Sequence, residues 1–245
     1  MGREAIRAIN LPAQSVQDHL IWDEYILRAC DSGLLGPTLR FWKVQDPAVV
    51  LGYGGKVSNE VRQDVCQKMR IPVVRRTSGG GTVLLDNGCL NYSLVLPMAW
   101  HPSLVSVSET NSFIMGRHQA AIAGLTGEWV DLKGDTDLAI EDRKISGNAQ
   151  RRTKSAILFH GTFLCEVNHD LMERLLPCPE RQPKYRKGRK HIHFLRNLPF
   201  REILIQQTIQ DCWQCLGDQP MEIVVDRSLM AEASGRFMRV FSFGQ

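Results

Sequence analysis

Two arginines and three glycines form the first segment whose residue types could do chemistry. In "RRTSGGGTV", Arg75 and Arg76 precede the glycines, while Ser78 and Thr82 flank them. The glycines are Gly79, Gly80 and Gly81. Glycine reaches backbone angles closed to other residues, consecutive exposed N–H groups can form a nest for an anion, and guanidinium groups fit phosphate or carboxylate oxygens. The segment therefore predicts a phosphate or carboxylate site, although glycines alone also fit a tight turn between strands.

This glycine segment is not one of the common phosphate loops. The sequence has no G-x-x-x-x-G-K-[ST] motif and no G-x-G-x-x-G that opens a helix. A P-loop and a dinucleotide-binding fingerprint are therefore both excluded.

Two later segments could complete such a site. In "RKISGNAQ", Lys144 precedes a Ser-Gly-Asn-Ala turn, and its ammonium could lean over an anion held there. The plainer interpretation is a surface lysine, which is the usual environment of lysine. In "FHGTFL", His160 lies within an expected strand, where a lone histidine is more often structural than catalytic.

The three segments together, in this order, resemble the lipoate-protein ligase and octanoyltransferase family. Its members carry R-R-x-S-G-G-G-x-V, then K-[IV]-[SA]-G-x-A, then H-G-[ST], matched here by residues 75–83, 144–149 and 160–162. "WDEYILRA" resembles the family's opening helix, and "RNL" at residues 196–198 resembles its late T-N-L or S-N-L. The resemblance extends from about residue 18 to about residue 200, and the order of the motifs carries it.

The resemblance implies a fold and a domain organisation. The fold is α+β, with a mixed, largely antiparallel β-sheet flanked by helices, as in biotin and lipoate protein ligases and the cores of class II synthetases. Mixed strand and helix patterns along the chain agree with that class. We expect residues 1–245 to form a single catalytic domain without the C-terminal accessory domain of many ligases.

The resemblance also implies acyl transfer to a protein. A lipoate-protein ligase activates lipoate or octanoate with ATP and Mg²⁺, giving acyl-AMP, and passes the acyl group to a lysine of a lipoyl carrier domain. The octanoyltransferase branch needs no ATP and takes octanoate from acyl carrier protein or from another lipoyl domain. We expect the ATP-dependent reaction, with the transferase as the alternative and a non-catalytic lipoate- or nucleotide-binding protein as a further one.

By the same resemblance, Lys144 is the predicted catalytic residue, because its ammonium would stabilise charge developing on the acyl oxygen. Asp137, in "GDTDL", would lie near the adenylate or its Mg²⁺. The predicted set of substrate- and adenylate-binding residues is Arg75, Arg76, Ser78, Gly79, Gly80, Gly81, Thr82, Asp137, Gly147, Ala149, His160, Gly161 and Thr162.

Several positions depart from the family's patterns. Where the ligase branch often has H-D-x-G-N, this chain has Leu85 for the histidine and Cys89 for the asparagine, and Thr136 stands where many ligases have asparagine. The octanoyltransferase branch that is most similar to ligases has a cysteine nucleophile shortly before the lysine motif, yet residues 111–143 contain no cysteine. This absence favours ATP-dependent ligation. Cys89 remains the candidate thiol, with a buried structural role preferred.

A basic segment and a cysteine pair lie outside these motifs. "KYRKGRK", residues 184–190, fits a solvated loop or a docking surface for an acidic carrier domain. We also expect a separate small accessory subunit as a possible partner, and no nucleic acid or membrane. "CWQC", from Cys212 to Cys215, fits core packing better than metal or redox chemistry, because no second pair accompanies it.

Composition and pattern set the context of these motifs. Hydrophobic residues make up 43% of the 245 residues, the net charge is +4, and seven scattered cysteines indicate a reducing environment, so we expect a cytoplasmic protein. Expected helices cover residues 14–30, 60–70, 108–125 and 201–217. Expected strands form a pair at 38–44 and 48–54, a strand at 71–74, a hairpin at 82–85 and 89–96, two strands within 143–167, and a late strand at 221–226.

Overall fold

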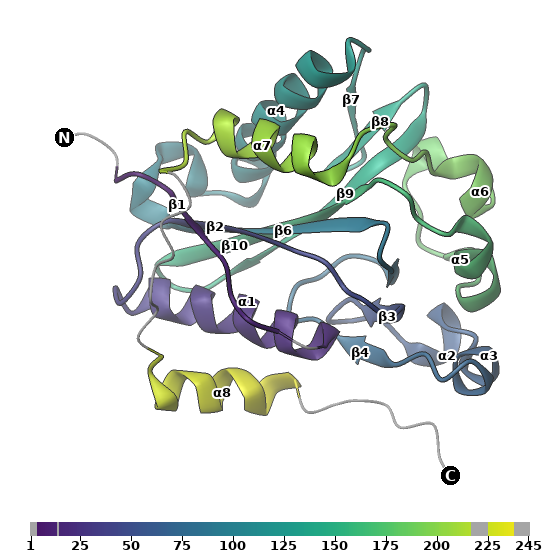
Figure 1. Cartoon of the computed structure of the whole chain (residues 1–245), viewed down its shortest axis with the longest axis horizontal. Coiled ribbons are helices and arrows are strands. Elements are labelled where there is room, and N and C mark those ends of the chain that lie inside the picture. Colours follow the sequence, from purple (N-terminus) through teal and green to yellow (C-terminus); the bar gives the residue numbers. More distant parts are fainter. Residues whose placement is uncertain (1–3, 14, 217–224, 238–245) are drawn as a thin grey trace.

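A seven-stranded sheet crosses the middle of the molecule in a computed structural model that describes residues 4–13, 15–216 and 225–237 (Figure 1). Its strands, in spatial order, are β1 (Arg7–Ile9), β2 (Thr38–Trp42), β6 (Cys89–Pro97), β10 (Ala156–Leu164), β9 (Arg143–Arg152), β8 (Asp137–Ile140) and β7 (Asp131–Lys133). Only β1 and β2 run parallel, and the other neighbours are antiparallel. The predicted mixed, largely antiparallel sheet is confirmed.

A smaller sheet lies beside one end of the large one and carries the glycine segment. Its strands are β4 (Val73–Arg75), β3 (Ala48–Leu51) and β5 (Val83–Leu85), in the spatial order β4-β3-β5. The predicted pairing of 38–44 with 48–54 is therefore wrong. Both edges of β2 are occupied by β1 and β6, and both edges of β3 by β4 and β5, so the two strands cannot pair with each other.

The hairpin predicted around Asp86-Asn87-Gly88 is also wrong, because β5 and β6 belong to different sheets. The Asp86 carboxylate accepts hydrogen bonds from Gly88 N at 3.0 Å and Asn168 N at 2.8 Å. A Cβ on Gly88 would lie 2.1 Å from backbone atoms of Glu166. The turn is therefore tied to the segment that follows β10, and it directs the chain from one sheet into the other.

Helices cover both faces of the large sheet (Figure 1). The pair α4 (Val107–Thr126) and α7 (Glu202–Cys212) lies on one face, and α1 (Val16–Asp31) lies on the other with α8 (Arg227–Phe237) outside it. The short helices α2 (Val57–Glu60), α3 (Gln63–Lys68), α5 (His169–Leu175) and α6 (His191–Phe194) lie around the small sheet and the end of β9. The single helix predicted at 60–70 is interrupted at Val61, which is extended.

Local sequence signals explain the two long helices. Ser15 and Asp18 form a reciprocal capping box at the start of α1, which satisfies two backbone donors. Helix α4 ends at Gly127, whose φ of 68° suits glycine at a C-terminal cap. Both helices therefore begin and end within two residues of their predicted bounds.

The two faces of the large sheet differ in polarity. On the face toward α4 and α7, side chains such as Leu94 and Phe159 join an apolar core with residues of both helices. On the opposite face, directly paired positions include Ser93 with His160 and Asn91 with Thr162. Buried polar side chains need hydrogen-bonding partners. We therefore expect a site among the polar side chains on the sheet face that α1 covers.

Two further sequence predictions concern membrane-spanning segments and the late strand. No helix within the described ranges is long and apolar enough to cross a membrane. The late strand predicted at 221–226 lies mostly outside the described residues.

Candidate active site

The predicted catalytic lysine points at an acidic partner from the neighbouring strand. Lys144 Nζ on β9 lies 2.7 Å from Asp137 Oδ1 on β8, with side-chain exposures of 23% and 14%. The backbone of Lys144 is fixed from outside the sheet, since Arg196 N donates to its carbonyl at 2.9 Å. A Cβ on Gly147 would lie only 2.5 Å from Lys144 Nζ. The absence of a side chain at Gly147 therefore makes room for the ammonium.

The second oxygen of Asp137 is bonded to the basic segment. Tyr185 OH donates to Asp137 Oδ2 at 2.9 Å, and the Tyr185 ring packs against Phe194. Burial raises the pKa of Tyr185 well above its ordinary value, and the neighbouring Asp137 carboxylate adds to that rise, so the phenol keeps its proton. Tyr185 therefore orients Asp137, which in turn orients Lys144.

The glycine segment lies against β9, the strand that also carries Lys144. A Cβ on Gly80 would lie 3.8 Å from the Ala149 Cβ, and the φ of Gly80, +88°, suits glycine. Gly52, at the end of β3, packs under this loop so closely that a Cβ there would lie 2.0 Å from the Gly80 carbonyl oxygen. Gly52 is not among the predicted site residues, although the glycines of "LGYGG" are a signal in the sequence.

The two arginines hold carbonyl oxygens of loops. Arg76 Nη2 donates to Gly79 O at 2.7 Å and Gly81 O at 2.8 Å, and Arg75 Nη1 donates to three carbonyls of residues 52–55. Burial lowers the pKa of Arg76 to about 10, and the nearby Glu60 carboxylate opposes that shift. These contacts support loop-holding roles, while a direct role in phosphate binding stays a prediction.

The hydroxyl of Ser78 points away from the loop into the polar face of the sheet. Ser78 Oγ lies 2.6 Å from His160 Nε2, and His160 Nδ1 lies 3.0 Å from Asp23 Oδ2 on α1. Asp23 is not among the predicted site residues, because it lies 55 residues before Ser78 and 137 before His160 in the chain and no local motif marks it.

The remaining predicted residues are held in structural contacts. Thr82 Oγ1 donates to Glu60 Oε2 at 2.6 Å, and Thr162 Oγ1 donates to Asn91 Oδ1 at 2.6 Å. A Cβ on Gly161 would lie 1.8 Å from Asn148 Oδ1. The predicted substrate-binding roles of Thr82, Gly161 and Thr162 stay predictions.

Asn148 connects the lysine motif to its surroundings and was missed among the predicted binding residues. Its amide oxygen accepts from Tyr92 OH at 2.6 Å, and its amide nitrogen donates to Thr136 O at 2.6 Å. Thr136 returns a bond from Oγ1 to Asn148 O at 2.7 Å. The S-G-N-A turn predicted from sequence is thus part of strand β9, and the side chain of Asn148 fixes that strand to the segment before β8.

Cys89 is buried in the protein interior. It lies on β6 with an exposure of 0%, and its thiol donates to Leu84 O at 3.8 Å. Burial raises its pKa well above the ordinary value of 9.0, and the nearby Asp86 carboxylate raises it further, so the thiol is protonated and unreactive. The buried structural thiol preferred from the sequence is confirmed. Cys212 also packs against the apolar core, and its pKa is raised to about 12 by burial.

The described residues do not offer Mg²⁺ a protein-built site at Asp137. Each carboxylate oxygen of Asp137 already has a partner, Lys144 or Tyr185. Across the described ranges, no three His, Cys, Asp or Glu side chains are grouped so that they could hold a metal ion. The predicted metal role of Asp137 therefore finds no support in the donor set, and any Mg²⁺ would depend mainly on oxygens of a bound nucleotide.

The basic segment divides into structural arginines and exposed lysines. Arg186 is buried over the Phe194 ring, and Arg189 Nη2 donates to Asp142 O and Tyr185 O at 2.8 Å. The lysines of the segment are exposed, namely Lys184, Lys187 and Lys190. The segment is therefore an ordered loop beside the Lys144 pair, with ammonium groups facing solvent.

Comparison with known proteins gives a family and a fold. Residues 15–216 match the model of the lipoyl protein ligase A/B catalytic domain. An octanoyltransferase, LipM of Brevibacillus brevis, is 29% identical over 233 residues, which cover 84% of each chain. The lipoate-protein ligase LplJ of Bacillus subtilis is 33% identical over 121 residues, 49% of this chain and 35% of the relative.

Among solved structures, a bipartite lipoate protein ligase from Thermoplasma acidophilum, reported with its E2 lipoyl domain, superimposes with a TM-score of 0.73 at 22% identity, covering 95% of this chain and 92% of that chain. A lipoate-protein ligase A bound with ATP gives 0.73 at 21% identity, covering 95% of each. These likenesses confirm the predicted lipoate-ligase type of fold. Together with the family model, they show that the chain belongs to the lipoyl protein ligase A/B catalytic domain family.

Proposed function

We propose that this protein is an acyltransferase that moves an octanoyl group, or its lipoyl counterpart, to a lysine of a lipoyl carrier domain. The observation that carries the proposal is the Lys144–Asp137 pair at 2.7 Å, on the strand that the glycine loop contacts through Ala149. An acyl carbonyl lying between loop and lysine would meet a fixed ammonium on one side and backbone N–H groups on the other.

The geometry suits stabilisation of a tetrahedral intermediate. As the acceptor amine attacks the acyl carbonyl, negative charge develops on the carbonyl oxygen, and the Lys144 ammonium is oriented to stabilise it. The new amide forms when the carbon–leaving group bond breaks, and the proton lost by the amine passes to the leaving group or to water. The small residues Gly79, Gly80 and Gly81 leave space for the acyl chain against the loop backbone.

The relatives favour a donor that is already activated. Octanoyltransferases named LipM match this chain over most of its length, at 28–29% identity. A thioester of octanoate on a carrier protein needs no ATP, because its carbonyl is already reactive toward an amine. The described cysteine nearest to the glycine segment in sequence, Cys89, is buried, so we propose direct attack of the carrier amine on the thioester.

ATP-dependent ligation is the second candidate, and a specific feature favours it. Residues 111–143 contain no cysteine, and Cys89 is fully buried, so the thiol expected of a thioester-forming transferase is missing from both places. A chain that lacks this thiol could instead accept the acyl group as the acyl-AMP made from a free acid and ATP.

The test is the intact mass of a purified lipoyl carrier domain after incubation with this protein. One reaction contains octanoyl-acyl carrier protein without ATP, and a second contains free octanoate or lipoate with ATP and Mg²⁺. We expect modification in the first reaction, lost in Lys144→Ala and retained in Lys154→Ala, a matched control on the exposed turn between β9 and β10. Modification only in the second reaction would establish the ligase.

A third result would refute both candidates. If neither reaction modifies several different carriers, while the protein still binds octanoate or ATP in calorimetry, the chain is a non-catalytic binding protein. Adding candidate small partner subunits to the same reactions separates this outcome from the absence of the predicted accessory subunit.

A further inference from the structure

We infer that Asp23 and His160 are positioning residues that set the direction of the hydrogen bond made by Ser78 and thereby fix the glycine loop for acyl transfer. This inference rests on the proposed function. It starts from a line of buried contacts that runs from helix α1 across the large sheet to the loop, with Ser78 only 1% and Asp23 2% exposed.

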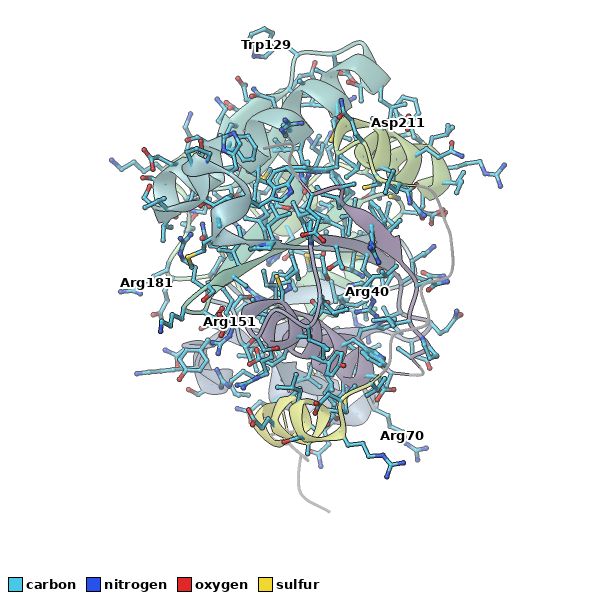
Figure 2. The ribbon with its side chains drawn as sticks, turned by 90° about the vertical axis from the view of Figure 1, so that its left-hand side faces the viewer. Arg40, Arg70, Trp129, Arg151, Arg181 and Asp211 are labelled. Atoms are coloured by element: carbon cyan, nitrogen blue, oxygen red, sulfur yellow. The ribbon has the colours of Figure 1, made fainter. Side chains whose placement is uncertain are left out.

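The acidic end of the line is firmly anchored. Asp23 Oδ1 accepts from Ser93 Oγ at 2.6 Å and forms an ion pair with Arg40 Nη1 at 3.2 Å. Arg40 is itself 1% exposed and also contacts His19. Figure 2 shows Arg40 beside helix α1 in the interior of the molecule. Both donors therefore hold the Asp23 side chain in place through the same oxygen.

The chemistry of the partners fixes each proton along the line. A carboxylate only accepts, so His160 Nδ1 carries a proton and donates it to Asp23 Oδ2. With the proton on Nδ1, Nε2 is the acceptor, and Ser78 Oγ donates to it at 2.6 Å. This leaves the lone pairs of Ser78 Oγ free to accept from Arg76 Nε at 3.0 Å. Asp23 therefore determines the tautomer, and the tautomer determines which way Ser78 donates.

Arg76 transmits that arrangement to the loop. The same guanidinium that donates to Ser78 also donates to Gly79 O and Gly81 O. With these carbonyls turned toward Arg76, the loop amides are left for another acceptor. Among the described residues, no hydrogen bond from the N–H of Gly79, Gly80 or Gly81 to a protein acceptor is present. An incoming acyl oxygen would find those donors already oriented.

The same contacts could be taken for a nucleophilic serine with its base and acid. Two features argue for positioning instead. Ser78 is almost completely buried, and its oxygen accepts from the cationic Arg76 guanidinium, which withdraws electron density from the oxygen and makes it a weaker nucleophile. Helix α1 also fixes the loop from a second side, since Arg151 contacts both Glu24 and Thr77 O at 3.2 Å. Arg151 is labelled in Figure 2.

The first measurement needs no substrate. Nitrogen-15 shifts of the histidine rings, with His160→Gln to assign the signal, should report a proton on Nδ1 of His160 in the wild type and on Nε2 in Asp23→Asn. The amide signals of Gly79, Gly80 and Gly81 should shift in Asp23→Asn. They should not shift in Asp31→Asn, a control on the same helix whose carboxylate binds Thr153 and Ser155 at the β9–β10 turn.

The second measurement is the kinetics of acyl transfer. In Asp23→Asn and in Ser78→Ala, kcat should fall about 10- to 100-fold, while the KM for the carrier domain changes less than about threefold. Ser78→Ala leaves the Asp23–Arg40 pair intact, so it serves if Asp23→Asn does not fold. Because both variants interrupt one line of contacts, the double variant should lose no more than about the larger single loss.

Three results would overturn the inference. If the His160 tautomer or the loop amide signals are unchanged in Asp23→Asn, the Asp23 carboxylate does not act on the loop. Fully additive losses in the double variant would show that Asp23 and Ser78 act independently. An acyl group found on Ser78 by mass spectrometry would make the serine a nucleophile. If the wild type transfers no acyl group, the proposed function fails, and the nuclear magnetic resonance arms still decide whether the line positions the loop.

Discussion

Gly52→Ala should disable the site through a collision with the loop backbone. The added Cβ would lie 2.0 Å from Gly80 O, and ordinary van der Waals contact begins at 3.4 Å, so the loop must move by about 1.4 Å. Gly80 O belongs to the backbone and cannot rotate away as a flexible side chain could. Since displacement of about 1 Å in a catalytic site can reduce the rate about 100-fold, we expect kcat/KM to fall by about that factor.

The measurement compares Gly52→Ala with Gly54→Ala under saturating and subsaturating carrier concentrations. Gly54 lies in the same loop, has open space where its Cβ would be, and should retain activity within about twofold. Thermal unfolding of both variants controls for loss of structure. A folded Gly52→Ala protein with kcat/KM within about threefold of the wild type would refute the claim that the Gly80 backbone position matters.

Three other predictions test separate parts of the structure. Cys89→Ala should retain acyl transfer while the free energy of unfolding falls by about 1–2 kcal/mol, and loss of activity with an unchanged melting temperature would contradict the structural role. Tyr185→Phe keeps the ring but removes the donor to Asp137, so steady-state kinetics should show a fall in kcat of about 3- to 10-fold. Burial lowers the pKa of His118 from 6.5 to about 3, so the unfolded state binds a proton that the folded state does not bind as the pH falls below 6.5. The free energy of unfolding should therefore decline between pH 6.5 and pH 3. Urea unfolding at several pH values should show this decline, and it should be less steep in His118→Gln.

Local patterns were sufficient for most elements of this fold and for the lysine side of the site. Capping by Ser15 and termination by Gly127 are decided by neighbouring residues, so the bounds of α1 and α4 followed from the sequence. The motif around Lys144 likewise needs only the adjacent strand β8 to gain its partner Asp137. Elements determined by contacts close in the chain were therefore predictable.

Strand partners were not predictable in the same way. Short apolar runs around Asp46-Pro47 and around Asp86-Asn87-Gly88 fit hairpins locally, yet each run lies in a different sheet from its neighbour. At the second turn, the Asp86 carboxylate binds Asn168 N, 82 residues later in the chain. Such a contact outweighs the local preference for a hairpin, and a single sequence holds no sign of it.

The role of Arg76 shows why residue type alone left the centre of the site ambiguous. An arginine beside glycines allows two arrangements. The arginine can bind an anion together with the glycine N–H groups, or it can bind the glycine carbonyls and leave the N–H groups to the anion. Ser78, His160 and Asp23 remove the ambiguity, because together they leave Ser78 Oγ as an acceptor that faces Arg76 Nε. Because Arg76 donates to the Gly79 and Gly81 carbonyls, its positive charge acts on the loop, and under the proposed function the loop amides would face the acyl group. The anion-binding role expected of the arginines stays a prediction, and the contacts that they make in the structure are with loop carbonyls.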